Sequence, residues 1–267
     1  MNSPLLIGCN INSLSTTNLN LLKNKDLIAL NQDTLYQQAY LAAKVNDCYI
    51  MVKDIEKRYG NKRAFAIYNP NDAAKKVTLN FSVIDLADSV ALHDCFTKKD
   101  IGKFYGTYEV TVPKHGTKIY VAEADTRLER TRYEAETGYS KAYSEIDWNI
   151  CQYSEASYCS GGYKVGYIGG SNSNNYLEWS NVYSKEGGDY KLTIGYICGE
   201  NRTINVYVNG KKAKGLSCNS GGWEKVGKKT LDITLEKGEN TIRLVNTSGW
   251  LPDMDYIDVT PAIPTSV

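Results

Sequence analysis

The stretch Thr203-Ile204-Asn205-Val206-Tyr207-Val208-Asn209-Gly210 decides the fold of the second half of this 267-residue chain. Its first six residues include the β-branched and aromatic types that favour strands. The Asn-Gly pair that follows is the strongest short-range signal for a tight hairpin turn. The stretch therefore predicts two antiparallel strands joined at residues 209–210.

Similar runs surround this hairpin, and glycine pairs separate them. We expect further strands over Tyr190–Tyr196, Thr230–Leu235 and Asn240–Val245. The glycine pairs mark turns at 161–162, 169–170, 187–188 and 221–222. Together these signals predict a β-sandwich over residues 133–260, a length that can hold a core of its own.

Residues 45–122 carry a second set of short alternating runs bounded by turn residues. The expected strands are Cys48–Val52, Ala64–Tyr68, Lys76–Phe81, Val90–Asp94, Thr107–Val112 and Lys118–Val121. Such spacing is typical of a small antiparallel sandwich. The charged residues 123–132 lack the alternation of apolar and polar residues that is typical of a strand, so we expect a linker there.

Residues 1–44 follow a different pattern. Pro4–Cys9 is a short apolar run of the kind that forms buried parallel strands. Ser15 is a candidate N-cap for a helix through Leu22, and Asn24 is a candidate end. A single strand and helix cannot bury both faces of the strand, so this βα unit indicates part of a larger fold.

The composition excludes several classes of partner. Lys and Arg total 31 and Asp and Glu total 30, which argues against nucleic acid, because its partners usually show a clustered basic surface. No apolar run reaches the roughly 18 residues of a membrane helix. The first residues lack the charged start and cleavage site of a signal peptide.

The seven cysteines contain no CxxC pair, which argues against a zinc site. Their odd number means that at least one thiol has no partner within the chain. Cys151–Cys159 and Cys198–Cys218 are possible disulfides, and buried free thiols are an equal alternative.

A family resemblance of the first half rests on three stretches, which are Ser3-Pro4-Leu5-Leu6-Ile7-Gly8-Cys9-Asn10-Ile11, Asn24-Lys25-Asp26-Leu27-Ile28-Ala29-Leu30-Asn31-Gln32-Asp33 and Val112-Pro113-Lys114-His115-Gly116-Thr117-Lys118-Ile119-Tyr120. In combination they resemble glycoside hydrolase family 27, the α-galactosidases. The resemblance implies that residues 1–44 are the last βα unit of a (β/α)₈ barrel and that residues 45–122 are the antiparallel sandwich that follows it. The expected fold class is mainly β, with two antiparallel β-sandwich domains preceded by this single βα unit.

The resemblance does not extend to a catalytic site. Family members usually carry Asp where this chain has Asn10, and often Arg where it has Asn12. Their catalytic aspartates lie on earlier barrel strands that nothing in this chain matches, so we assign no catalytic residue. We interpret Asp26, Asp33 and Asp47 as helix-end and turn residues.

The second half carries an ordered set of motifs, which are Tyr133-Glu134-Ala135-Glu136, Gly162–Gly169, Val206–Gly210, Gly221-Gly222-Trp223, Gly238–Leu244 and Pro252–Val259. The set resembles carbohydrate-binding modules of families 6 and 35. In these families a ring pair sandwiches a sugar, and Tyr167 and Trp223 match that pair. Asp253 matches a polar contact, and Trp250 lies in the same loop.

The resemblance and the residue types also predict a structural calcium site. Glu134 and Glu136 are two apart on an expected strand and would point to one face. First and last strands lie side by side in such modules, which would bring Asp255 close. Because Ca²⁺ takes carboxylate oxygens, we predict Ca²⁺ at Glu134, Glu136 and Asp255, with Asp258 a weaker candidate. The alternative is an exposed acidic edge.

The remaining rings receive structural roles. We assign Trp148 and Trp179 to packing, because large rings are usually mostly buried. His93 and His115 are expected to serve packing or turn roles.

The expected function follows from these assignments. The chain is interpreted as the C-terminal part of a secreted or periplasmic α-galactosidase that binds a galactose-containing or plant cell-wall polysaccharide and does not hydrolyse it. The alternative is a non-catalytic lectin-like or adhesive protein. A third reading, an independent hydrolase, would need a carboxylate pair in a cleft.

Overall fold

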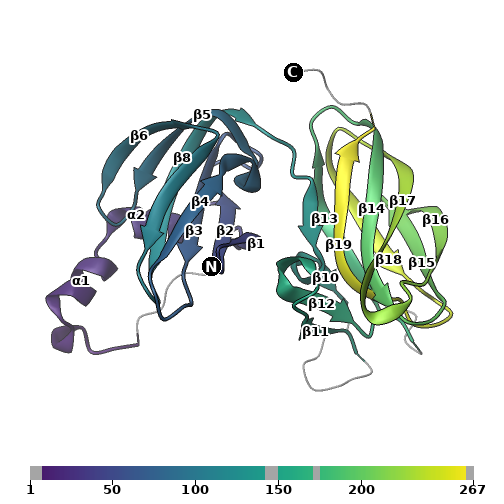
Figure 1. Cartoon of the computed structure of the whole chain (residues 1–267). Coiled ribbons are helices and arrows are strands. Elements are labelled where there is room, and N and C mark those ends of the chain that lie inside the picture. Colours follow the sequence, from purple (N-terminus) through teal and green to yellow (C-terminus); the bar gives the residue numbers. More distant parts are fainter. Residues whose placement is uncertain (1–7, 142–149, 171–174, 263–267) are drawn as a thin grey trace. The chain divides into compact units, whose positions relative to one another are not determined.

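A computed structural model describes residues 8–141, 150–170 and 175–262. The chain divides into two compact units, Met1–Leu128 and Glu129–Val267 (Figure 1). Antiparallel sheets make up most of both units, which confirms the mainly β class.

The first unit builds its core between a six-stranded sheet of order β1-β2-β3-β8-β5-β6 and the two-stranded sheet β4-β7. Ile50 and Phe65 from the larger sheet pack with Val77 and Leu79 from the smaller one. The strands are β1 Tyr40–Val45, β2 Cys48–Asp54, β3 Lys62–Tyr68, β4 Lys75–Asn80, β5 Leu86–Asp94, β6 Lys99–Tyr105, β7 Thr107–Val112 and β8 Thr117–Arg127.

All six strands expected in this region are present, and β1 and β6 are additional. The two additional strands form the edges of the larger sheet. Most residues of β6 are exposed, so this strand lacks the apolar alternation that would have revealed it.

The linker expected over 123–132 is partly strand. β8 continues to Arg127 and pairs with Leu86 of β5 at that end. Ala122 and Ala124 are buried while Glu123 and Asp125 are exposed. Buried and exposed residues therefore alternate as in a strand. The buried residues are small alanines, so the sequence shows the charged residues but no clear apolar alternation.

Two short helices precede the sheets, α1 Thr16–Leu22 and α2 Lys25–Asn31. Ser15 caps α1 as expected, since its side chain accepts a hydrogen bond from the Asn18 amide. α1 ends at Leu22 with Lys23 as its C-cap, so Asn24 is not its end but the N-cap of α2. The Asn24 side-chain amide donates to the Cys95 carbonyl at 2.7 Å. Most of the expected strand Pro4–Cys9 lies outside the described residues, so its barrel origin stays a prediction.

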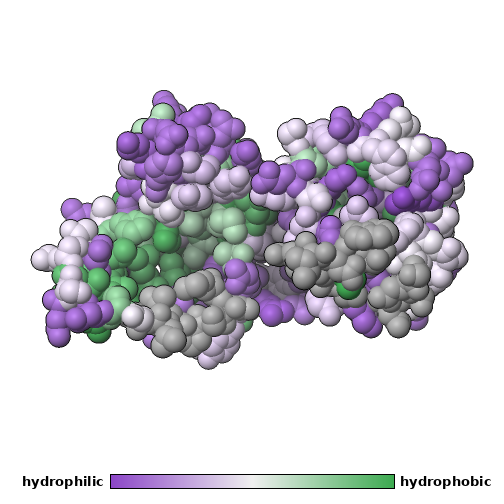
Figure 2. Space-filling model, turned by 90° about the horizontal axis from the view of Figure 1, so that it is seen from below, coloured by the Kyte–Doolittle hydropathy of each residue, from purple (hydrophilic) through white to green (hydrophobic). Residues whose placement is uncertain are grey.

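Apolar side chains remain exposed on this part of the first unit. Ile11, Leu21 and Ile28 are each more than one third exposed. Figure 2 shows apolar residues gathered in a hollow on the left of the view. A cavity of about 620 Å³ lies beside α2, with Leu30 and Leu92 in its wall.

His93 attaches α2 to the sheet beside this cavity. Its Nε2 lies 3.0 Å from Asp26 Oδ2 on α2, and its Nδ1 lies 2.8 Å from Asp100 Oδ1 on β6. The hydrogen bonds to Asp26 and Asp100 raise the pKa of His93 above its usual value. Asp26, Asp33 and Asp47 occupy the first turn of α2, the residues after it and the β1–β2 turn, as interpreted.

The second unit packs a five-stranded sheet of order β10-β13-β18-β15-β16 against a six-stranded sheet of order β11-β12-β19-β14-β17, in which β9 also pairs with β19. The strands are β9 Arg132–Glu134, β10 Tyr139–Ser140, β11 Gln152–Glu155, β12 Tyr163–Gly166, β13 Tyr176–Ser184, β14 Gly188–Cys198, β15 Arg202–Val208, β16 Lys211–Cys218, β17 Gly222–Leu235, β18 Gly238–Val245 and β19 Asp253–Pro261.

The predicted hairpin is confirmed. Asn209 and Gly210 join β15 to β16 with φ of 50° and 78°, the left-handed values that a two-residue turn requires. The three strands expected around it are also present as β14, β17 and β18.

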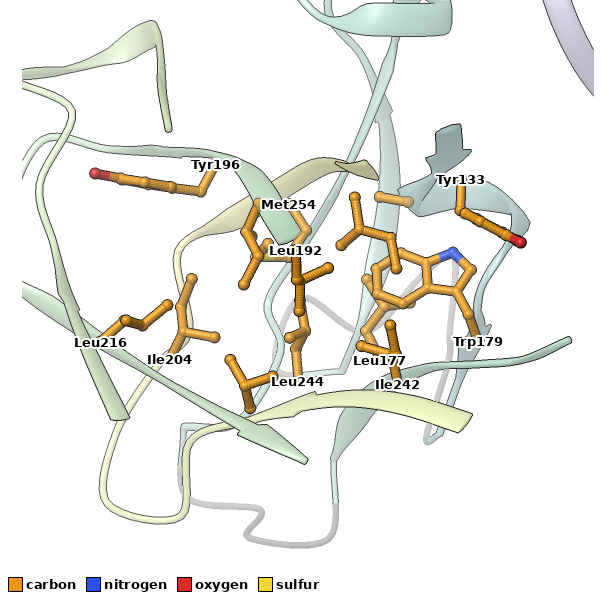
Figure 3. Packing of buried hydrophobic residues seen from close by; sticks show 14 of the residues in the cluster. Tyr133, Leu177, Trp179, Leu192, Tyr196, Ile204, Leu216, Ile242, Leu244 and Met254 are labelled. Carbon is orange, nitrogen blue, oxygen red and sulfur yellow. The ribbon is translucent and has the colours of Figure 1, made fainter. Parts of the chain in front are cut away.

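The core of the second unit lies between its two sheets (Figure 3). Trp179 is only 1% exposed there, and its indole nitrogen donates to the Glu134 carbonyl at 3.1 Å. Its packing role is therefore confirmed, whereas Trp148 lies outside the described residues. All seven cysteines are free thiols, and only Cys9 is exposed.

We predict that His93→Ala lowers stability at acidic but not at alkaline pH. A histidine whose pKa is raised by folding stabilises fully below its unfolded pKa and loses that contribution as the pH rises through its folded pKa. Because solvent screens the partly exposed ion pairs of His93, the free energy of unfolding at about pH 5.5 should fall by about 1 kcal/mol or less. Urea unfolding of both proteins at about pH 5.5 and about pH 8.5 measures the difference. A destabilisation that grows with pH would contradict this role.

Candidate functional site

One cavity of about 430 Å³ in the second unit gathers aromatic and charged side chains. All four residues predicted to bind sugar line it, namely Tyr167, Trp223, Trp250 and Asp253. Its other lining residues are Ser154, Lys164, Gly166 and Arg202.

Tyr167 is displayed by a strained backbone. Its φ is 55°, a left-handed value that is uncommon for a residue with a bulky side chain. The next residue, Ile168, is fully buried and anchors the segment, while the Tyr167 ring stays 42% exposed. Strain of this kind persists where the surrounding structure enforces it and often marks a binding site.

Trp250 closes the same side of the cavity. Its ring lies edge-on to the Tyr167 ring, with 6.1 Å between the ring centroids. Gly170 lies directly against it, because a Cβ there would come within 2.4 Å of the indole. A glycine is therefore required for the indole to occupy this position.

Trp223 forms another wall of the cavity and is 45% exposed. It is the second residue of β17, directly after the Gly221-Gly222 pair. The Arg202 guanidinium lies 4.7 Å from its ring centroid. The Arg202 guanidinium also donates to the Leu251 carbonyl at 2.8 Å and pairs with Glu200 at 2.6 Å. These contacts hold the guanidinium in its cation–π position against the Trp223 ring.

Lys164 and Asp253 supply the polar groups of the cavity. Their charged atoms lie 2.7 Å apart, and less than one fifth of either side chain is exposed. Burial would lower the pKa of Lys164, but hydrogen bonds to Asp253 and Tyr158 raise it overall. The pair presents a hydrogen-bond donor and an acceptor side by side while adding no net charge.

The sequence pattern missed two of these residues. Lys164 lies inside the quoted segment Gly162–Gly169, so its place in the cavity could have been inferred from its neighbour Tyr167. Arg202 offered no such signal, because only the fold brings the start of β15 beside β17.

The three carboxylates predicted to bind Ca²⁺ gather at another place in the same unit. Glu134 ends β9, which pairs with β19 so that Glu134 lies opposite Tyr256, next to Asp255. Glu136 is not on a strand as we expected, because residues 135–137 form a 3₁₀ turn. Glu134 and Glu136 nevertheless both lie against Gly161.

These carboxylates are buried without a full set of partners. Glu134 is 5% exposed and Asp255 is 1% exposed. Glu134 Oε2 and both carboxylate oxygens of Glu136 have no hydrogen-bond partner. Burial raises the pKa of Glu136 and of Asp255 to about 7 each, and it also raises the pKa of Glu134. Such a cluster would be stabilised by a cation.

The donor set fits a hard divalent cation. Carboxylate oxygens are the ligands that Ca²⁺ prefers. Across the described parts of the chain, no three acidic, His or Cys side chains are already close enough to enclose an ion. Asp258, the weaker candidate, is instead paired with Arg132 at 2.7 Å.

The histidines take no part in either place. His93 bridges Asp26 and Asp100, and His115 lies in a turn with its Nε2 2.9 Å from Asp72. Their expected packing and turn roles agree with these contacts.

Two family models match the chain in succession. The α-galactosidase C-terminal β-sandwich domain matches residues 47–122, and the family 6 carbohydrate-binding module matches residues 134–261. No helix of the described residues has the length and apolar character needed to cross a membrane.

Curated relatives match the first half. Alpha-galactosidase 3 of Arabidopsis thaliana is 30% identical over 131 residues, which is 47% of this chain and 30% of that protein. Alpha-galactosidase A of Cellvibrio japonicus is 28% identical over 130 residues, which is 45% of this chain and 31% of that protein. The chain thus spans less than one third of the length of these relatives.

Solved structures match as well. A family 35 carbohydrate-binding module from Clostridium thermocellum is 31% identical, covers 48% of this chain and 97% of that chain, and has a TM-score of 0.43. The Arthrobacter globiformis T6 isomalto-dextranase complexed with panose is 15% identical, covers 91% of this chain and 43% of that chain, and has a TM-score of 0.51. The similarity to the isomalto-dextranase, at 15% identity, shows a similar fold and nothing about function.

Proposed function

We propose that this chain, which carries an α-galactosidase C-terminal β-sandwich domain followed by a family 6 carbohydrate-binding module, binds a glycan in the cavity of its second unit and does not hydrolyse it. The observation that carries the proposal is the convergence of Tyr167, Trp223 and Trp250 with the Lys164–Asp253 pair in one cavity.

The chemistry of the cavity suits a sugar. Exposed rings offer flat apolar faces to the C–H faces of a pyranose, and a few polar groups fix its orientation. Asp253 can accept a hydrogen bond from one hydroxyl while Lys164 donates to a neighbouring one. Because Lys164 is paired with Asp253 and Arg202 with Glu200, the cavity favours an uncharged glycan.

A galactose-containing or plant cell-wall polysaccharide is the proposed ligand. It agrees with the relatives of the first half, which are α-galactosidases. In a longer parent protein, an α-galactosidase that acts outside the cytoplasm, the module would hold the enzyme on its polymer and raise the local substrate concentration.

We also propose that the carboxylates of Glu134, Glu136 and Asp255 hold a structural Ca²⁺. The ion would supply the positive charge that the buried cluster lacks. Its binding energy would add to the stability of the folded unit, because the unfolded chain has no such cluster.

We expect Trp223→Ala to weaken glycan retention at least about tenfold, since a central aromatic residue of a binding site often contributes 2 kcal/mol or more. Affinity electrophoresis in gels containing a galactomannan measures retention. Tyr139→Ala is the matched control, because Tyr139 is an exposed ring of the same unit that does not line the cavity. Unchanged retention of Trp223→Ala would exclude this cavity as the binding site.

We expect Ca²⁺ to raise the melting temperature of the chain and a chelator to reverse the gain. In Asp255→Asn the gain should be largely lost, because one of the three charged ligands is gone. Thermal melts with Ca²⁺, with Mg²⁺ and with chelator measure the effect. An equal gain in Asp255→Asn would place the ion elsewhere.

We expect no release of nitrophenol from a nitrophenyl α-galactoside by the purified chain. The reaction needs two carboxylates flanking the scissile bond, and Asp253 is the only carboxylate among the residues that line the cavity in the described structure. A full-length α-galactosidase serves as the positive control. Sustained release that follows the chain through purification would overturn the non-hydrolytic assignment.

A further inference from the structure

We propose that cation binding at the carboxylate cluster and glycan binding in the cavity are coupled through the loop 156–162 between β11 and β12. The inference rests on the proposed function, because it joins the two binding sites named there. Tyr158 is the positioning residue that carries the coupling.

The loop holds the carboxylate cluster at one point. The backbone amide of Ser160 donates to Asp255 Oδ1 at 2.8 Å, and the Ser160 hydroxyl donates to Glu134 Oε1 at 2.7 Å. A Cβ on Gly161 would come within 2.8 Å of Glu136 Oε1. All three predicted ligands therefore lie against residues 160–161.

The same loop holds the cavity at a second point. The Tyr158 hydroxyl donates to the backbone carbonyl of Trp223 at 3.1 Å. It also hydrogen-bonds with Lys164, whose ammonium pairs with Asp253 in the cavity. Tyr158 and Ser160 are only two residues apart in this loop.

The loop is braced so that it moves as a unit. The Ala156 amide donates to the Gly162 carbonyl at 2.8 Å, and the Cys159 amide donates to the Ala156 carbonyl at 2.9 Å. Ala156 and Cys159 are buried against Ile197. Because of these contacts, the position of Ser160 also determines the position of Tyr158.

An ion bound at the cluster also orders the loop. Glu134 and Asp255 would coordinate the ion, and both carboxylates accept hydrogen bonds from Ser160, so fixing the carboxylates fixes the loop. A second link runs along β19, which places Asp253 in the cavity two residues before Asp255. An ion that fixes this arrangement lowers the cost of ordering Trp223 and Lys164 for the glycan, and the glycan favours the ion by the same factor.

Glycan affinity measured with and without Ca²⁺ tests the coupling. With a galactomannan as probe, the unaltered chain should bind at least about fivefold more tightly in Ca²⁺ than in chelator. In Tyr158→Phe, which keeps the ring and removes the hydroxyl, the ratio should fall to within about twofold. Tyr163→Phe is the matched control, because it removes a hydroxyl of the same hairpin that hydrogen-bonds to Glu155 instead. It should keep the full ratio.

Hydrogen–deuterium exchange without any glycan provides an independent readout. Ca²⁺ should slow exchange of the amides in 156–162 and in 222–226 of the unaltered chain. In Tyr158→Phe the protection should remain in 156–162 and disappear from 222–226.

The outcomes separate the two proposals. Retention on galactomannan that is the same with Ca²⁺ and with chelator, in a chain that Ca²⁺ stabilises, overturns the coupling and leaves the proposed function standing. Protection that reaches 222–226 equally in Tyr158→Phe also overturns it. No retention under any condition overturns the proposed function and this inference together.

Discussion

The pairing of β9 with β19 is the constraint on which the second unit depends. It brings residues 132–134, at the start of the unit, against residues 256–258, near its end. The same strand β19 pairs with β12 and β14, so it lies at the centre of its sheet. The β9 pairing makes Glu134 a neighbour of Asp255, and the β12 pairing brings Lys164 to Asp253.

Buried charges are compensated in the cavity but not in the carboxylate cluster, the two places to which β19 contributes. In the cavity, Lys164 and Asp253 neutralise each other and Arg202 is neutralised by Glu200. In the cluster, Ser160 donates hydrogen bonds to Glu134 and Asp255, and the positive charges of Arg130 and Arg132 lie near enough to favour the ionised carboxylates without neutralising them. A group of like charges in a region of low dielectric is costly unless it is protonated or meets a cation. The cavity is therefore already electrostatically balanced, whereas the cluster is not.

The first unit differs from the second in how completely its apolar surface is covered. The sandwich core between its two sheets is closed, with Ile50, Val77 and Leu79 fully buried. The helices α1 and α2 contain no buried residue and leave Leu21 and Ile28 exposed. Polar contacts of Asn24, Lys53 and His93 attach α2 to the rest of the unit.

The sequence by itself determined the elements whose signals are local. The run 203–210 specified its own hairpin, Ser15 specified its own cap, and the order of motifs identified the ring and carboxylate residues of the second unit. It did not reveal β6, whose edge position leaves its residues exposed, or the strand character of 123–127, whose inner residues are alanines. Only the tertiary structure decided that Arg202 lies behind Trp223, that Glu136 reaches the cluster from a 3₁₀ turn, and that one loop contacts both the cluster and the cavity. The physical reason is that these contacts join residues far apart in the chain, so they depend on strand pairing and register, which local patterns do not encode.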